Sequence, residues 1–463
     1  MKKLFCILTA VIFYLIPLAA CGGKSAGGYV VPDYADDIRI DIGAYITPPK
    51  PLVSLERYKD IAAAGINFLN DTGGTIGVRG YTVNDALAAM DYAKEAGLKV
   101  FVDDYQVSLY NRGTTPGNWR ADFSTNFPKY SVHEAYAGNF ICDEPGAIEF
   151  GNLKTISDAF NLNAPAGKTT FINLYPSYAN PAGGVGEGAL GGSFDEYVEN
   201  FMETVRPSVL SYDHYPLLRN DWDGGADMRP LYFSDMETVR HIAKKYGVPT
   251  HNFILSTEHL GYVFPTETDI RWQIAVNQAF GITSFSYFTY WLPTKGDDHT
   301  VPFSGYYNAP VNADGTKTAL YDYIKAVNYE VLAWDHVYLR FDWQGTAAIS
   351  GAGGEYAFSP LSHLKRANYP DGIEGVKSIA STGDVLCGIF KDADGNAGFM
   401  LTNATNPYDR KTVSVTVRFD GAYKGVQIFE KGVPQISGLD KNGGKTIELK
   451  AGEGKFLIPL KKA

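Results

Sequence analysis

The chain has 463 residues, of which 45% are hydrophobic and 20% charged, a composition typical of a globular protein with one large and one smaller domain. Its 51 acidic residues outnumber the 41 basic ones, the formal net charge is −10, and the basic residues form no run. Because binding to phosphate groups needs clustered cations, these numbers argue against nucleic acid as a partner.

The first residues have the pattern of a secretion signal. Lys2 and Lys3 precede an apolar stretch over residues 4–16, which is shorter than the roughly 20 residues of a membrane-spanning helix. The sequence Leu-Ala-Ala-Cys at 18–21 resembles a bacterial lipobox, in which the cysteine becomes the lipid-carrying first residue. We expect a signal peptide over 1–20, a lipid on Cys21 and a Gly-rich tether over 21–36. Ordinary signal cleavage beside an incidental cysteine is the alternative.

A repeated pattern of helix, glycine and short apolar strand runs over residues 37–336. The glycines are Gly65, Gly97, Gly247 and Gly281, and each directly follows a predicted helix. A glycine at this place adopts the left-handed conformation that ends a helix. The second helix begins at the Thr-Val-Asn-Asp sequence of 82–85, which has the form of a capping box.

The repeats contain eight candidate strands. They cover 38–46, 66–70, 98–103, 137–142, 169–174, 209–213, 253–257 and 282–288. Eight strands alternating with helices over some 300 residues predict a (β/α)8 TIM barrel over 37–336. A doubly wound sheet is the alternative, but no Gly-x-Gly-x-x-Gly sequence opens the first helix.

The pattern changes near residue 337. Short alternating strands at 385–390, 397–401, 412–419, 425–429, 446–449 and 454–459 are separated by turns. They predict a C-terminal antiparallel β-sandwich over 337–463 that packs on the barrel. Cys142 and Cys387 fall in different predicted domains, so we expect no disulfide.

The most informative feature is the sequence Asp143-Glu144-Pro145, which ends the fourth predicted strand. Pro145 disfavours helical geometry at Glu144 and stops ladder pairing, which places both carboxylates at the carboxyl end of the strand. Barrel active sites form at that end. An ordinary acidic turn before a helix is the alternative reading.

The other strands also end in acids, amides and aromatic residues. These are Asp41, Tyr45, Asn70, Asp71, Asp103, Asp104, Asn173, Tyr175, Asp213, His214, Tyr215, Glu258, His259, Tyr287, Tyr290 and Trp291. Such a rim suits a neutral, polyhydroxylated substrate, because hydroxyl groups need acceptors and sugar rings stack on aromatic faces. We expect Asp104, Asp143, Asn173, Tyr175, Asp213, His214, Tyr215, Tyr290 and Trp291 to contact the substrate.

These positions resemble those of the clan-A glycoside hydrolases, which carry a Glu acid/base after strand four and a Glu nucleophile after strand seven. The resemblance spans the barrel and assigns the two roles to Glu144 and Glu258. It implies retaining hydrolysis of a β-linked poly- or oligosaccharide by two carboxylates. One departure is Asp143, which stands where the family usually has Asn.

Two alternatives stay open. The first is an inverting glycosidase that combines Glu144 with Asp213 or Asp104. The second is a non-catalytic, glycan-binding lipoprotein on a degenerate hydrolase barrel.

The eight histidines form no metal-binding motif, and no Gly-x-Ser-x-Gly sequence indicates an esterase. We therefore expect a monomeric enzyme without cofactor or metal, attached to the cell envelope by its lipid, with a carbohydrate substrate.

Overall fold

The computed structural model describes residues 24–109, 121–179, 188–220, 225–295, 298–351, 360–364 and 373–463. The predicted signal peptide and Cys21 lie outside these residues. Among the helices that are described, none is both long and apolar enough to cross a membrane.

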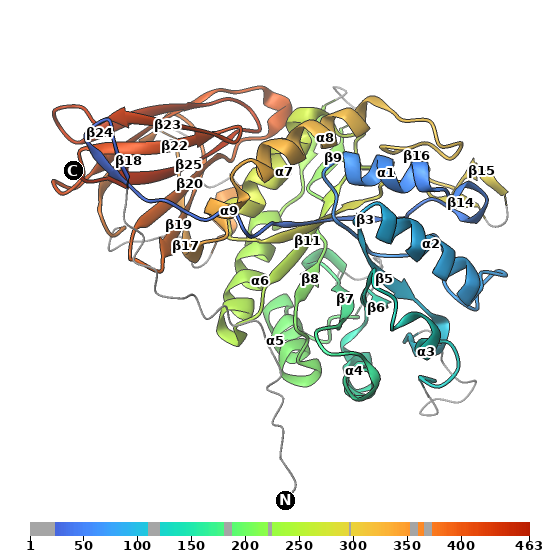
Figure 1. The fold of residues 1–463 in the computed structure, drawn as a ribbon. Coiled ribbons are helices and arrows are strands. Elements are labelled where there is room, and N and C mark those ends of the chain that lie inside the picture. The colour runs from blue at the N-terminus through green and yellow to red at the C-terminus, as the bar shows by residue number, and fades with distance from the viewer. Residues whose placement is uncertain are drawn as a thin grey trace, which may run out of the picture.

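Eight parallel strands form a closed barrel, which confirms the predicted fold class (Figure 1). They are β3 (Asp41–Tyr45), β4 (Phe68–Leu69), β5 (Lys99–Asp103), β6 (Tyr136–Asp143), β7 (Thr169–Leu174), β8 (Leu210–Tyr212), β11 (Thr250–Leu255) and β13 (Ser284–Phe288). β13 pairs with β3 and so closes the ring. All the strands run in the same direction, so their carboxyl ends share one rim.

Helices surround the barrel (Figure 1). They are α1 (Leu55–Ala63), α2 (Val83–Glu95), α3 (Phe127–Tyr130), α4 (Phe150–Asn163), α5 (Phe194–Val205), α6 (Tyr232–Tyr246), α7 (Glu267–Ala279) and α8 (Ala319–Leu332). The four predicted capping glycines all have φ between 69° and 79°. Thr82 and Asp85 form the predicted capping box of α2. These signals were local, which is why the sequence was sufficient to predict them.

The C-terminal region folds into two antiparallel sheets. The six-stranded sheet has the order β17 (Phe341–Ile349), β19 (Val385–Asp392), β20 (Ala397–Asn403), β25 (Gly454–Leu460), β22 (Gly425–Glu430) and β23 (Val433–Gly438). The three-stranded sheet has the order β18 (Val376–Ser381), β21 (Val413–Phe419) and β24 (Gly444–Leu449). The sequence did not predict β17, β18 or β23. Most side chains of β23 and half of those of β18 are exposed, so these two strands lack a clear apolar alternation.

The sandwich packs on α7 of the barrel (Figure 1). The Trp272 indole N–H donates to the Asn403 carbonyl at 3.1 Å, and the Thr402 hydroxyl donates to the Ala275 carbonyl at 3.1 Å. The Trp334 ring stacks on Phe429 with centroids 5.6 Å apart. Buried hydrogen bonds and aromatic contacts therefore join the two parts. Cys142 and Cys387 are both buried and free, one in each part.

The short elements lie mainly in the connections. The short strands are β1 (Lys24–Ala26), β2 (Tyr29–Val31), β9 (Leu217–Arg219), β10 (Ala226–Met228), β12 (Glu258–His259), β14 (Thr294–Lys295), β15 (Asp298–Pro302) and β16 (Tyr306–Asn308). β12 and β16 pair with each other. No strand was predicted from the sequence in the β14–β16 region.

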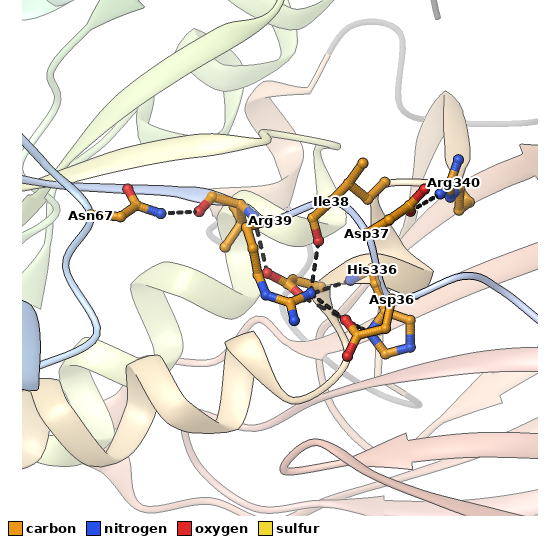
Figure 2. A network of polar contacts seen from close by, with 9 residues as sticks. Asp36, Asp37, Ile38, Arg39, Asn67, His336 and Arg340 are labelled. Atoms are coloured by element: carbon orange, nitrogen blue, oxygen red, sulfur yellow. Dashed lines mark hydrogen bonds and ion pairs between the residues drawn. The ribbon is translucent and has the colours of Figure 1, made fainter. Parts of the chain in front are cut away.

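A polar cluster ties the segment before β3 to α9 (Asp335–Tyr338), at the junction with the sandwich (Figure 2). Asp335 is fully buried and accepts hydrogen bonds from the Ile40 N–H at 3.0 Å and from the His336 N–H at 2.7 Å. The Arg39 guanidinium pairs with exposed Asp36 and lies 3.5 Å from Asp335. Arg39 thus lies close to two carboxylates of this cluster, and Arg340 pairs with a third, Asp37.

Asp335→Ala is expected to lower the free energy of unfolding by about 1–3 kcal/mol, because the Ile40 N–H would lose its acceptor. Asp36→Ala is the matched control, since its exposed ion pair with the same arginine contributes little. Urea unfolding of both variants measures the difference. Equal losses in the two variants would contradict the structural role given to Asp335.

Candidate active site

Three carboxylates lie at the rim where β6, β7 and β8 end. Asp143 is the last residue of β6, Glu144 follows it, and Asp213 follows β8. Glu144 has φ of 49°, and its N–H donates to the Asn173 carbonyl at 2.8 Å. This left-handed turn takes Glu144 out of the strand direction. The Asn173 amide nitrogen donates to Asp143 at 3.1 Å and to Asp213 at 2.8 Å, so one side chain binds two of the acids.

The environment favours a protonated Glu144. Burial raises the pKa of this carboxyl strongly, and the charges of Asp213 and Asp143 raise it further. Burial also raises the pKa of Asp143 and of Asp213, while the hydrogen bond from Asn173 opposes the rise in both. A carboxylic acid that keeps its proton at neutral pH can act as a proton donor.

A chain of buried hydrogen bonds fixes the orientation of the Asn173 amide. The Ser211 hydroxyl donates to Asn173 Oδ1 at 2.9 Å, so it accepts from His251 Nδ1 at 2.9 Å. His251 Nε2 then accepts from the Ser286 hydroxyl at 2.9 Å. With its oxygen bound to Ser211, Asn173 presents its amide nitrogen to the acids. The predicted strand 253–257 left out His251, because polar residues inside the barrel break the apolar pattern of a strand. Ser211 stood within the predicted strand 209–213 but was not singled out.

The burial of His251 predicts that the folded protein loses stability in acid. Burial among aromatic rings lowers its pKa to about 3 from the usual 6.5, and its exposed fraction is 1%. Below pH 6.5 the unfolded chain binds a proton that the folded protein does not, so stability falls as the pH drops from about 6.5 to about 3. In His251→Gln this part of the pH dependence should vanish. Urea unfolding at pH 4 and pH 7 tests it, and an unchanged pH dependence would contradict the assignment.

Glu258 lies on β12, three residues after the end of β11. Its carboxylate accepts a hydrogen bond from the Asn308 amide on β16 and lies 3.4 Å from Arg219 Nη1. Both partners are hydrogen-bond donors, and the side chain is 20% exposed. This is the environment of an anionic acceptor that solvent or substrate can reach.

Strand β16 also brings Tyr306 to the acids. Its ring stacks on His259 with centroids 5.0 Å apart and an interplanar angle of 13°. Burial raises the pKa of Tyr306, and the charges of Asp143 and Glu144 add to the rise. β16 therefore contacts Glu258 through Asn308 and approaches Glu144 through Tyr306. Neither Asn308 nor Tyr306 follows a predicted strand, so the sequence pattern did not indicate a role for them.

Tyr175 and Tyr215, two predicted substrate residues, lie beside the carboxylates. Burial raises the pKa of Tyr175 to about 12, with a further contribution from the charge of Glu144. Tyr215 hydrogen bonds to Asp213, and its ring lies against Phe288 with centroids 5.2 Å apart. Together they place two aromatic rings next to the acids.

Three other residues that were predicted to contact the substrate are hydrogen-bonded to or packed against other side chains of the protein. Asp104 accepts from the Gln106 N–H at 3.1 Å and from the Tyr130 hydroxyl at 3.1 Å. His214 is fully buried and pairs with Asp235 at 2.7 Å. Tyr290 is 1% exposed and packs near Tyr321 of α8. Contacts of these three residues with a substrate stay predictions.

A cavity of about 440 Å³ opens at the same rim, among the connections after β3, β4, β5 and β13. Trp291 lines it, although the residue is only 1% exposed and Arg57 lies over its ring. The indole therefore contributes to the cavity wall rather than to an open stacking platform. Tyr45 and Asp103 line the cavity as well.

No family model matches the chain, and no curated protein matches it. Solved structures do match. A protein of Bacteroides fragilis, to which alpha-galactosidase activity is ascribed, is 9% identical with a TM-score of 0.48 over 93% of this chain and 81% of its own. A glucosidase from Croceicoccus marinus is 12% identical with a TM-score of 0.40 over 92% and 96%. An endo-beta-1,4-mannanase from Thermotoga petrophila is 11% identical with a TM-score of 0.38 over 90% and 98%. At these values the likeness concerns the fold alone.

Proposed function

We propose that the protein is a glycoside hydrolase with Glu144 as its general acid/base. The observation that carries the proposal is the buried carboxyl group of Glu144 at the rim of the barrel, whose pKa is strongly raised by burial and by the charges of two neighbouring carboxylates. Hydrolysis of a glycosidic bond needs one protonated and one ionised carboxyl group. Tyr175, Tyr215 and Tyr306 add the aromatic surface that sugar rings contact.

In the proposed reaction Glu144 gives its proton to the glycosidic oxygen as the bond to the anomeric carbon breaks. Glu258 attacks that carbon and forms a glycosyl ester. Glu144, now ionised, then takes a proton from water, and the hydroxide displaces Glu258 with net retention. Arg219 and Asn308 support this role, because both donate to the Glu258 carboxylate. The substrate would be a β-linked poly- or oligosaccharide.

A second mechanism is favoured by the position of Asp213. Its charge raises the pKa of Glu144, and it shares the Asn173 amide with Asp143. In an inverting enzyme Asp213 would act as the base that activates water, with Glu144 as the acid. Asp104 supports such a role less well, because the charges that raise the pKa of Glu144 are those of Asp213 and Asp143.

The test is a proton NMR time course of the wild-type protein on a panel of β-linked glycans. A β-anomer as the first product supports retention with Glu258, and an α-anomer supports inversion with Asp213. Binding of a glycan without any cleavage would replace the hydrolase proposal by the glycan-binding alternative.

From the N-terminal sequence pattern we also propose a location. Cys21 carries a lipid that attaches the enzyme to the cell envelope. Labelling of growing cells with a fatty-acid analogue tests it. Label in the wild type and none in Cys21→Ser is the expected result, and equal label in both would contradict it.

A further inference from the structure

The cavity among the connections after β3, β4, β5 and β13 lies at the same rim as the three acids, but none of the three lines it. Its volume of about 440 Å³ lies within the range of small-ligand sites. Apolar surface comes from Tyr45, Val78 and Phe140, and carboxylates come from Asp71 and Asp103. This mixture of apolar walls and acceptors matches the two faces of a sugar ring.

The two acids of the cavity differ in what they can offer a ligand. Asp71 accepts from the Ile46 N–H, the Thr47 N–H and hydroxyl, and the Gly73 N–H, at 2.6–3.2 Å. These four donors occupy it. Asp103 accepts only from the Thr75 hydroxyl at 2.6 Å, so its Oδ1 has no donor within the described part of the chain.

The Asp103 carboxyl group is suited to hydrogen bonding with hydroxyl groups of a ligand. Burial and the charges of Asp71 and Asp104 raise its pKa to about 7. Near neutral pH the carboxyl group can therefore accept a hydrogen bond or donate one. A sugar hydroxyl does both.

An aromatic wall connects the cavity to the acids. The Tyr45 ring stacks on Phe288 with centroids 5.8 Å apart, and Phe288 lies 5.2 Å from the Tyr215 ring. Tyr45 lines the cavity, and Tyr215 hydrogen bonds to Asp213. Three aromatic rings in contact thus link the cavity wall to the residue that binds Asp213, so the cavity and the acids are neighbours at the rim.

We propose that this cavity is a second sugar subsite, in which Asp103 binds hydroxyl groups of a unit beyond the one that is cleaved. The substrate is then a carbohydrate chain rather than a glycoside of a single sugar. The inference rests on the proposed hydrolase function for its position along the chain, but binding in the cavity can be measured without catalysis.

Two variants test the subsite. Asp103→Asn removes the charge and keeps one acceptor for Thr75. Val78→Trp fills the cavity from a half-buried position whose backbone hydrogen bonds stay in place. Val132→Trp is the matched control, because Val132 is 76% exposed and precedes β6 at the opposite end of the barrel.

The probes are the tetrasaccharides of β-1,4-linked glucose, mannose, xylose and galactose, together with the aryl glycosides of the same single sugars. The ratio of kcat/KM for the cleaved tetrasaccharide to kcat/KM for the aryl glycoside should fall about 10-fold or more in Asp103→Asn and Val78→Trp. Val132→Trp should keep the wild-type ratio. An unchanged ratio in Val78→Trp would overturn the subsite.

Calorimetric titration of the tetrasaccharides separates this result from a failure of the hydrolase proposal. If the wild type binds a tetrasaccharide but cleaves none, the hydrolase proposal fails. Weaker binding in Val78→Trp would then still support the subsite, and equal binding would refute it. Absence of binding to all four tetrasaccharides in the wild type would refute it too.

Discussion

Glu144→Gln is expected to lower kcat/KM on an unactivated glycan by about 10²–10⁴-fold, the usual contribution of a general acid. Glutamine preserves the size of the side chain but carries no acidic proton. On an aryl glycoside with a nitrophenolate leaving group, the loss in the bond-breaking step should be much smaller, because that group departs without protonation. Steady-state kinetics on both substrates measures the contrast.

Glu149→Gln is the matched control for this prediction. Glu149 lies five residues further on and accepts a hydrogen bond from the Gly146 N–H at 3.2 Å, which glutamine can still accept. It should keep wild-type rates on both substrates. Equal losses for Glu144→Gln on the two substrates would show that Glu144 does not supply the proton.

Removal of the Glu258 carboxylate is expected to abolish turnover of both the glycan and the aryl glycoside, since a good leaving group does not compensate for a missing nucleophile. Glu258→Ala tests the retaining mechanism. Azide can enter the space left by the side chain, and it should restore release of nitrophenolate and give the α-glycosyl azide from a β-glycoside.

Asp213→Ala is the companion variant. In the retaining mechanism it should lower the rate without azide rescue, because Asp213 acts on Glu144 through charge and through the shared Asn173 amide. Rescue of Asp213→Ala but not of Glu258→Ala, together with an α-anomer as the first wild-type product, would replace retention by inversion.

The barrel could be predicted from the sequence because its signals are local. Capping glycines and apolar strands recur, and β7 covers the predicted residues 169–174 without a shift. β11 begins at Thr250 rather than at 253, because Thr250, His251 and Asn252 are polar and yet buried. A search for apolar runs cannot find polar residues that are bound inside a barrel.

The site was predictable where it follows a strand end. Pro145 indicated that Glu144 lies at the end of the fourth strand. The order of the predicted strands placed Asp213 at the end of the sixth. The partners of Glu258 were not predictable, because Asn308 reaches it only through the pairing of β12 with β16, across 50 residues of sequence. Nor does a sequence show that Asn173 binds both Asp143 and Asp213, since this depends on the order of strands around the barrel.

The most direct test of the central claim compares reducing-end release by the wild type and Glu144→Gln on the same β-linked glycans, with glycan binding measured in parallel. We predict that the wild type cleaves at least one glycan, and that Glu144→Gln binds this glycan but does not cleave it at a comparable rate. Cleavage by Glu144→Gln at the wild-type rate would contradict the assignment of Glu144 as the proton donor.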